Sequence, residues 1–401
     1  MMENSEAAEL VKSGKLDLLD GNFYAGDPEP VYAYLRDKRP VYFDATNELW
    51  GISRYQDIVA IEKDTRTWNN SGGYRPNIEA DSSIIGLDDP EHAERRRLVA
   101  RRFTPRAVEA HTTHIQEIVK ELLDAISDKG AAEVVAQIAA PLPARMIGVL
   151  LGFSENQWPK LVHWSETTIA LGGGPRYVSD EGIMAAVEFA EAALAVSEQR
   201  RATPRDDLLS VWTKAEVGGC PISSDNIASD ALLLLDGGAE TTRTVIANGI
   251  NTLIQHPEQQ DLLRREPERM TVAVEELIRW TTPILNMCRV ATKNTEVAGV
   301  PIAKGQQVVL MYSSANRDEK IFENPERFDV TRAPNPHITF GFGTHFCLGA
   351  SLARLELKIM FTELLARFDR WAWADEIGPR RLPNSFVRGI TEFPITFRSI
   401  A

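Results

Sequence analysis

A long apolar stretch between Ser223 and His256-Pro257 constrains the fold of this chain more than any other feature. Ser223 is a residue type that caps the start of a helix, and a proline ends one. The helix expected between them has about 30 residues and a length of roughly 45 Å. Its segment Ala231–Leu235 is too apolar to face water, so the helix is expected to cross the hydrophobic core.

The remaining pattern is mostly helical, with short strands. Apolar residues at three- and four-residue spacing predict helices over 106–128 and 181–201. The predicted strands are Val41–Phe43 paired with Leu49–Ile52, a hairpin of Val297–Ile302 with Gln307–Met311 around Lys304-Gly305, and Phe393–Phe397. Since no repeat or Gly/Ser-rich linker divides the chain, we expect one domain over 1–401. It is mainly α with small β-sheets, and its β-rich region lies within about 20–65 and 290–312.

The charge and hydropathy of the chain exclude several classes of protein. There are 44 Lys and Arg against 57 Asp and Glu, a net charge of −13, which argues against a nucleic-acid partner. No apolar run reaches the ~20 residues of a membrane helix, and charges interrupt the start of the chain where a signal peptide would be apolar. We therefore expect a soluble, cytoplasmic protein without a membrane anchor. Its three cysteines, Cys220, Cys288 and Cys347, are too few for a disulfide scaffold.

One of the three cysteines lies in a glycine-rich motif. Residues 340–349 read Phe-Gly-Phe-Gly-Thr-His-Phe-Cys-Leu-Gly. The segment resembles the haem-ligand signature F-G-x-G-x-H-x-C-x-G of the cytochrome P450 family at six positions, a chance match on the order of 10⁻⁶ in such a chain. The resemblance implies that Cys347 is the thiolate ligand of haem b. The glycines let the backbone approach the sulfur, and a helix is expected to begin just after it, with its dipole favouring the anion.

The long helix carries a second motif of the same family. Residues 237–242 read Gly-Gly-Ala-Glu-Thr-Thr and resemble [AG]-G-x-[DE]-T-T. The resemblance implies that Glu240 and Thr241 deliver protons during oxygen activation. Glycine inside a helix costs about 1 kcal/mol relative to alanine, so the pair indicates a close approach or a local bulge. The Thr241 hydroxyl can bond to a preceding carbonyl of the helix.

A third match, Glu276-Leu-Ile-Arg279, fits the family's E-x-x-R pattern, whose two charges share one helical face. The resemblance implies a buried structural pair that is linked to the segment Phe322–Phe328, with Arg327 as its third member. We assign this group to folding and not to catalysis.

The resemblance also names residues around the haem. The propionates, which require cationic or hydrogen-bonding partners, are assigned to His92, Arg96, Arg289 and His345, and further haem contacts to Phe340, Gly341 and Gly349. Members from bacteria dock an acidic iron–sulfur protein on the cysteine side. We interpret a group of basic residues as that docking face: Arg95, Arg97, Arg101, Arg102, Arg354 and Lys358.

The segments that line the substrate pocket in this family are apolar here. The predicted contacts are Ile84, Ile85, Leu171, Ala239, Ile284, Leu285, Met287, Phe386 and Val387. Few charges occur among them, which predicts a hydrophobic substrate. Cys288 is expected beside this pocket. The segments 21–36, 69–77 and 286–299 are similar to members that oxidise steroid or terpenoid side chains.

The resemblance covers nearly the whole chain and implies the P450 fold, a helix-rich lobe around a buried haem. The implied reaction inserts one oxygen atom of O₂ into a C–H bond, with two electrons from a ferredoxin and its NAD(P)H-dependent reductase. The alternatives are a peroxide-driven haem peroxygenase, a non-catalytic haem- or ligand-binding protein, and a helical interaction protein without a cofactor. Glu240 and Thr241 favour the monooxygenase, because the alternatives do not require a proton-delivering pair.

Overall fold

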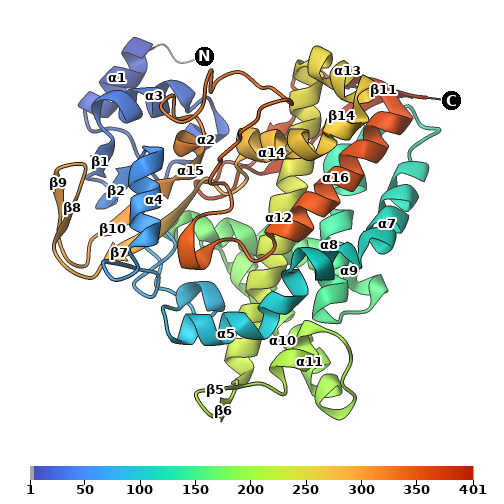
Figure 1. Ribbon diagram of the computed structural model, residues 1–401, viewed down its shortest axis with the longest axis horizontal. Coiled ribbons are helices and arrows are strands. Elements are labelled where there is room, and N and C mark those ends of the chain that lie inside the picture. Colours follow the sequence, from blue (N-terminus) through green and yellow to red (C-terminus); the bar gives the residue numbers. More distant parts are fainter. Residues whose placement is uncertain (1–3, 401) are drawn as a thin grey trace.

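Helix α12 (Ser224–Gln255) passes through the helical part of the molecule in the computed structural model, which describes residues 4–400 (Figure 1). Its 32 residues give it a length of about 48 Å. The Ser223 side chain caps it by accepting a hydrogen bond from the Asn226 amide, at 3.1 Å. Helices α8 (Pro141–Leu151), α9 (Trp158–Ile169), α10 (Asp180–Ala202) and α16 (Ala350–Arg367) pack against it. The predicted core-crossing helix is therefore confirmed.

The remaining helices and the strands are mostly short. The other helices are α1 (Asn4–Lys12), α2 (Gly21–Ala25), α3 (Glu29–Lys38), α4 (Tyr55–Lys63), α5 (Glu91–Ala100), α6 (Pro105–Glu109), α7 (Thr112–Asp124), α11 (Leu208–Trp212), α13 (Pro257–Arg265), α14 (Met270–Thr281) and α15 (Tyr312–Ala315). The strands outside the main sheet are β4 (Ala131–Glu133), β5 (Glu216–Val217), β6 (Cys220–Pro221), β8 (Thr295–Val297), β9 (Val300–Ile302), β11 (Phe368–Trp373), β12 (Arg380–Arg381), β13 (Ile390–Glu392) and β14 (Pro394–Ser399). This composition confirms the prediction of a mainly α chain with small sheets.

The main sheet lies beside the helical lobe, at the left of Figure 1. It has the order β1 (Val41–Asp44), β2 (Leu49–Ile52), β10 (Gln307–Met311), β7 (Asn286–Ala291) and β3 (Trp68–Asn69). The β2–β10 pair is parallel and the other pairs are antiparallel. Segments far apart in the sequence thus form one sheet, and the predicted pairing of the first two strands is confirmed.

Alternation along the sheet divides its packing between two faces. In β10, Val309 and Met311 join an apolar cluster with Val31 and Leu35 of α3. The neighbouring side chains of β10, Val308 and Leu310, point the other way and pack with α4 in a second cluster. This is the period of two that a strand imposes on its side chains. The same alternation along β7 decides which of its side chains reach the candidate site.

Two predicted elements differ from the structure. The helix expected over 106–128 is divided into α6 and α7. At this break the Thr112 hydroxyl donates to the Glu109 carbonyl, the last of α6, at 2.7 Å. The hairpin expected between Val297–Ile302 and Gln307–Met311 is wrong. Strand β9 pairs with β8 through a turn at Ala298-Gly299, where both φ angles are positive as a tight hairpin requires. Strand β10 is then left to pair with β2 and β7.

Across residues 4–400, every helix is either too short or too polar to cross a membrane.

Candidate active site

A cavity of about 540 Å³ lies between α12, the cysteine loop (residues 340–349) and β7. It is also lined by α5, by the end of α9, by residues of α16 and by two short 3₁₀ helices, η1 (Ile84–Gly86) and η5 (Ala170–Gly173). Most of the lining side chains are apolar. A cavity of this size and character is typical of a site for a small hydrophobic molecule.

Cys347 lies on the wall formed by the cysteine loop. Its sulfur accepts hydrogen bonds from the amides of Gly349 and Ala350, at the start of α16. Burial raises the pKa of the Cys347 thiol, while these amides and the nearby Arg96 and Arg354 oppose the rise. A bound metal ion would lower the pKa of this thiol further, so the environment is suited to a metal-bound thiolate.

The glycines of the cysteine loop have identifiable structural roles. Gly341 and Gly343 have φ angles of 70° and 73°, in the left-handed region that favours glycine. A Cβ at Gly343 would also lie 2.6 Å from the carbonyl oxygen of Glu62 in α4. The loop could therefore not keep this path with larger residues at these positions.

Four predicted haem partners gather on the same cavity wall. His92, Arg96, Arg289 and His345 all line the cavity, and the rings of His92 and His345 lie 4.1 Å apart between centroids. Burial, followed by the charges of His92, Arg289 and Arg96, lowers the pKa of His345 to about 2. Arg289 is paired with Glu62 and His92 with Asp89, each at 3.1 Å, whereas within residues 4–400 no ion pair engages Arg96.

These groups fit a haem. The Nε2 atom of His92 is buried and has no hydrogen-bond partner among residues 4–400, and it lies beside cationic groups that suit the two propionates. Phe340, Gly341 and Gly349 border the same space as the Cys347 sulfur. We call His92, Arg96, Arg289 and His345 the basic wall. The Cys347 thiol, the basic wall and the apolar walls suit the iron, the propionates and the macrocycle of that cofactor, respectively.

The surroundings of α12 explain why two glycines, Gly237 and Gly238, follow each other in this helix. The Thr241 hydroxyl donates to the Gly237 carbonyl at 2.7 Å, which confirms the predicted bond within the helix. A Cβ on Gly237 would meet no atom within 4 Å, since this residue faces the cavity. A Cβ on Gly238 would clash with the Ile147 side chain of α8. One glycine therefore keeps the cavity open, and the other allows close helix packing.

Glu240 lies behind this wall, away from the cavity lining. It accepts hydrogen bonds from Ser165 at 3.0 Å and from Arg243 at 2.9 Å, and Arg243 also pairs with the partly exposed Glu166. Burial raises the pKa of Glu240, whereas the Arg243 charge opposes the rise. Its predicted part in proton delivery can therefore only be exerted through neighbouring groups.

Six of the nine predicted substrate contacts line the cavity: Ile84, Ile85, Leu171, Ile284, Met287 and Phe386. Ala239, Leu285 and Val387 do not, and those three predictions are corrected. Ala239 lies two residues, or about 200°, around α12 from Gly237, so it faces the opposite side. Leu285 and Val387 each follow a cavity-lining residue in extended chain, where neighbours point to opposite sides.

The expectation that Cys288 lies beside the pocket is also wrong. Met287 and Arg289 of β7 face the cavity, and the intervening Cys288 faces the cluster that contains Val309. Burial raises the pKa of the Cys288 thiol to about 12, so this thiol is inert at neutral pH. Cys220 is exposed in β6 and does not line the cavity.

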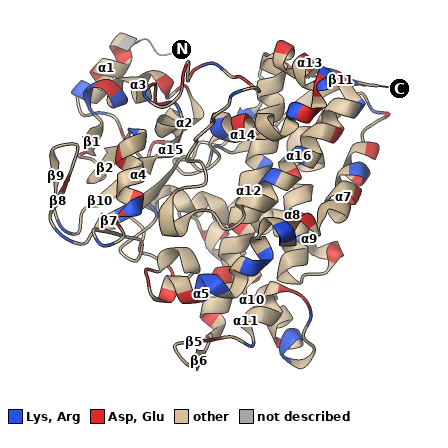
Figure 2. Cartoon of the chain, in the orientation of Figure 1, with Lys and Arg blue, Asp and Glu red and all other residues tan. Residues whose placement is uncertain are grey.

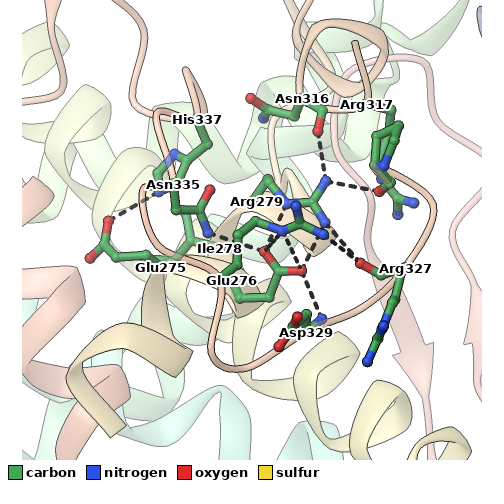
Figure 3. Close-up of polar contacts among 12 residues, drawn as sticks. Glu275, Glu276, Ile278, Arg279, Asn316, Arg317, Arg327, Asp329, Asn335 and His337 are labelled. Atoms are coloured by element: carbon green, nitrogen blue, oxygen red, sulfur yellow. Dashed lines mark hydrogen bonds and ion pairs between the residues drawn. The ribbon is translucent and has the colours of Figure 1, made fainter. Parts of the chain in front are cut away.

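The Glu276–Arg279 pair is fully buried and closes a larger network (Figure 3). Arg279 donates twice to Glu276, both at 2.8 Å, and once to the Asn316 carbonyl, also at 2.8 Å. The Asp329 amide donates to the same carboxylate at 3.0 Å. The predicted link to the segment after Phe322 is present, because the carbonyls of Pro325 and Arg327 accept from Arg279.

The third member of the network is not the side chain of Arg327. Arg332 pairs with Glu276 at 3.1 Å, whereas the Arg327 side chain is exposed and points away in Figure 3. The backbone turns so that the carbonyl of Arg327 faces Arg279, and the side chain of Arg327 is thereby directed outward. The assignment of Arg327 is therefore corrected to Arg332.

The predicted docking face loses one residue. Arg95 is buried and pairs with Asp230 of α12 at 2.6 Å, so it cannot contact a partner. Arg97, Arg101 and Lys358 are exposed, and the basic positions of α5 are coloured blue in Figure 2. We call the remaining group, Arg97, Arg101, Arg102, Arg354 and Lys358, the basic face.

Several polar residues of the cavity were not predicted. Among them are Arg75, Thr168, Asp236 and Glu356. The signal for Asp236 was present, because it is a lone carboxylate that follows four leucines in the core helix. Glu356 is buried in α16, and burial raises its pKa to about 8, against a hydrogen bond from Thr242. No motif marks Glu356 or Arg75.

The chain is similar in sequence and in structure to known proteins. The family model described as Cytochrome P450 matches residues 180–395. A steroid C26-monooxygenase from Mycobacterium tuberculosis is 39% identical over 398 residues, covering 97% of this chain and 98% of the relative. A methyl-branched lipid omega-hydroxylase from the same species is 34% identical, covering 96% and 94%. The crystal structure of CYP109E1 from Bacillus megaterium with testosterone has a TM-score of 0.86 and 31% identity, covering 93% of this chain and 98% of that chain.

Proposed function

The chain belongs to the cytochrome P450 family and is a haem-dependent monooxygenase that acts on a hydrophobic compound, and from this premise we propose that it hydroxylates a steroid or terpenoid. The observation that carries the proposal is the apolar cavity, whose lining includes Ile84, Leu171, Ile284 and Phe386 as well as Cys347. The relatives named for steroid and branched-lipid oxidation support the same class of substrate. The peroxygenase and non-catalytic alternatives are not favoured, because these relatives are monooxygenases or hydroxylases.

The cofactor we propose is haem b, with Cys347 as its ligand. When bound, the haem supplies the oxidising chemistry. The side chains of His92, Arg96, Arg289 and His345 would hold its propionates. Phe340, Gly341 and Gly349 would border the macrocycle. The protein's part is to hold these groups and to keep the cavity apolar.

The proton path that we propose passes along α12 and α9. The Thr241 hydroxyl holds a proton at Oγ1 on the cavity wall, where it now donates to the Gly237 carbonyl. Glu240 lies next to it in sequence, and its carboxylate contacts Ser165 and Arg243. Arg243 in turn contacts Glu166, whose side chain is 40% exposed. These contacts connect Glu240 with the surface, and its neighbour in α12, Thr241, lines the cavity.

Replacing Thr241 with alanine should separate oxygen consumption from product formation. We expect unchanged haem content and continued NAD(P)H oxidation, but product formation lower by about 10²-fold, since one positioned proton donor is worth at least that factor. The electrons should appear as hydrogen peroxide, measured together with product. Thr241→Ser, which keeps the hydroxyl, is the matched control and should remain coupled. Tight coupling in Thr241→Ala would show that this hydroxyl is not in the proton path.

The electron donors that we propose are a ferredoxin and an NAD(P)H-dependent ferredoxin reductase. Support comes from the basic face on an otherwise acidic protein, on α5, α16 and the short helix η2 (Arg101–Phe103) between α5 and α6. The segment η2 packs against α16, so the two parts of the face are neighbours. Charge complementarity of this kind mainly raises the rate of association.

Charge reversal on the basic face tests this donor. The double change Arg101→Glu and Lys358→Glu should slow the first electron transfer from an acidic ferredoxin by about tenfold and weaken its dependence on salt. Stopped-flow reduction under carbon monoxide measures the rate. Lys304→Glu, an exposed reversal in the loop after β9, should leave the rate unchanged. If the double variant behaves like Lys304→Glu, the ferredoxin docks elsewhere.

A ligand screen tests the substrate class. Steroids, terpenoids and fatty acids would be added to the holoenzyme, and displacement of water from the iron would be followed by the shift of the haem spectrum. We expect steroids with an alkyl side chain, or terpenoids, to produce the largest shift and to be hydroxylated with surrogate redox partners. A response confined to fatty acids would contradict the proposal.

The cytoplasmic location stays a prediction, which cell fractionation would check.

A further inference from the structure

Two polar side chains in the apolar part of the cavity are used neither by the predicted haem contacts nor by the proton path. Asp236 projects from α12, and Arg75 lies in the loop between β3 and η1; both line the cavity. An isolated carboxyl and an isolated guanidinium are costly in such a place unless they have partners. The contacts around each show which partners are present and which are missing.

The hydrogen bonds around Asp236 define the proton positions. The Thr168 Oγ1 atom lies 2.7 Å from the Trp164 carbonyl and 2.7 Å from Asp236 Oδ1. A hydroxyl has one proton and cannot donate it to both oxygens, so the two contacts together require a second proton. Asp236 Oδ1 must then carry a proton and donate it to Thr168. Burial raises the pKa of Asp236 to about 8, against the Thr168 contact and the Arg75 charge, in agreement with a protonated carboxyl.

This arrangement leaves Asp236 Oδ2 as an acceptor at the cavity wall. A protonated carboxyl has one O–H and one carbonyl oxygen, and the O–H is already used by Thr168. No hydrogen bond to Oδ2 is present within residues 4–400. The cavity therefore offers a neutral acceptor at this point.

Arg75 supplies the complementary donor. Its guanidinium stacks on the Phe386 ring, 3.6 Å from the centroid, and Gly172 packs against it so closely that a Cβ there would lie 2.8 Å from Nη1. Neither a hydrogen bond nor an ion pair engages this guanidinium in the described part of the chain, and its Nη1 is buried without a partner. The side chain is therefore held in place by packing while its N–H groups remain unused.

Thr168 and Gly172 connect the two groups in space. They are four residues apart at the end of α9 and in η5, which is about one helical turn. Thr168 contacts Asp236, and Gly172 contacts Arg75. The acceptor and the donor therefore flank the same end of one helix, on the same cavity.

We propose that Asp236 and Arg75 form a polar subsite that binds an alcohol hydroxyl on an otherwise hydrocarbon substrate, the hydroxyl donating to Asp236 Oδ2 and accepting from the Arg75 guanidinium. The inference rests on the proposed function and defines its substrate further, as a sterol-type alcohol. Asp236 precedes Thr241 by five residues, or about 7.5 Å along α12. The anchored hydroxyl is thus kept away from the carbon that is oxidised.

Other polar functions fit this subsite less well. A ketone would accept from Arg75 but leave Asp236 Oδ2 unpaired. A carboxylate would face that oxygen and two further acids of the cavity lining, Glu79 and Asp81. An ammonium group would be repelled by Arg75. A hydroxyl alone satisfies both members.

Three steroids with one carbon skeleton test the subsite: the 3-hydroxy compound, the 3-ketone and the 3-deoxy hydrocarbon. Their dissociation constants would be measured on the holoenzyme from the spectral shift. We expect the alcohol to bind most tightly and the hydrocarbon least tightly, with a factor of about ten for each hydrogen bond. A linear alcohol, ketone and alkane of equal length form a second set, and a carboxylic acid analogue is included. Equal affinities within both sets, no binding of any member, or tightest binding of the acid would overturn the proposal.

Variants separate the two contacts. Asp236→Leu should remove the advantage of the alcohol over the ketone, and Arg75→Leu should remove the advantage of the ketone over the hydrocarbon. Asp236→Asn should retain alcohol binding, because its amide can donate to Thr168 and present its oxygen to the cavity. Ser229→Ala, at another polar position of the lining, is the control and should change neither ratio. Unchanged ratios in both leucine variants, or loss of alcohol binding in Asp236→Asn, would refute the assignment.

The same samples distinguish this inference from the proposed function. Every variant should show the thiolate-type spectrum of the reduced carbon monoxide complex, since neither residue contacts Cys347 through any bond described above. Loss of that spectrum in the unmodified protein would refute the proposed function. A normal spectrum and steroid turnover, with no preference for the alcohol, would refute the polar subsite alone.

Discussion

The Cys347→Ala variant will lack the thiolate-type absorption of the reduced carbon monoxide complex and will have no monooxygenase activity. Of the three cysteines, Cys347 alone lines the cavity, and its sulfur is held by the Gly349 and Ala350 amides at the start of α16. No other thiol can replace it, because the thiol of Cys288 packs on the opposite side of β7. The measurement is the difference spectrum of the reduced protein with and without carbon monoxide, at equal haem content.

Cys288→Ala is the matched control for this experiment. It also removes a buried thiol from the same part of the molecule, but its side chain packs with Leu285 and Val309 and does not face the cavity. It should retain the full thiolate-type spectrum. If Cys347→Ala keeps the spectrum, or if Cys288→Ala loses it at equal haem content, the ligand assignment is wrong.

Among the variants described here, Glu276→Gln should have the largest loss in the free energy of unfolding. The change removes the carboxylate that pairs with Arg279 and Arg332 and accepts from the Asp329 amide. Arg279 is completely buried, so its charge would be left uncompensated. Breaking a buried pair in this way costs about 3–5 kcal/mol. Urea unfolding of the holoprotein, followed by circular dichroism and by haem absorbance, measures the loss.

The chain contains a suitable comparison for the Glu276 variant. Glu266 and Arg269 form an ion pair with the same three-residue spacing, but both side chains are partly exposed. Glu266→Gln should therefore cost no more than about 1 kcal/mol. If the two variants are equally stable, the buried network does not hold the segment after α15 in place, and its assignment to folding is wrong.

The sequence predicted the parts of the site where local chemistry restricts local residue choice. Cys347 and its glycines could be found because a sulfur held by backbone amides needs a specific short loop. Thr241 could be found for a similar reason, since its bond to Gly237 lies within one helical turn. Both arrangements depend on neighbours in the sequence, which a motif describes well.

The errors concern contacts that depend on distant parts of the chain. Arg95 was expected on the surface, but it pairs with Asp230, 135 positions later. Arg327 and Arg332 lie in the same loop, and only the direction of the backbone decides which of them reaches Glu276. Asp236 was not singled out, because its partner Thr168 belongs to another helix. These pairings depend on tertiary packing, and residue spacing in the sequence does not predict them.

Strand β7 links specificity for the substrate to retention of the cofactor. Met287 faces the substrate part of the cavity, and Arg289, two positions later on the same face, belongs to the basic wall for the haem. A shift of this strand by one residue would turn both side chains into the opposite core and expose Cys288 instead. Laboratory evolution of new selectivity should therefore tolerate exchanges at Met287 but reject insertions or deletions between Asn286 and Ala291. The length of this strand therefore constrains both sites, because a change of length made to alter substrate binding would also displace the residue that contacts the haem.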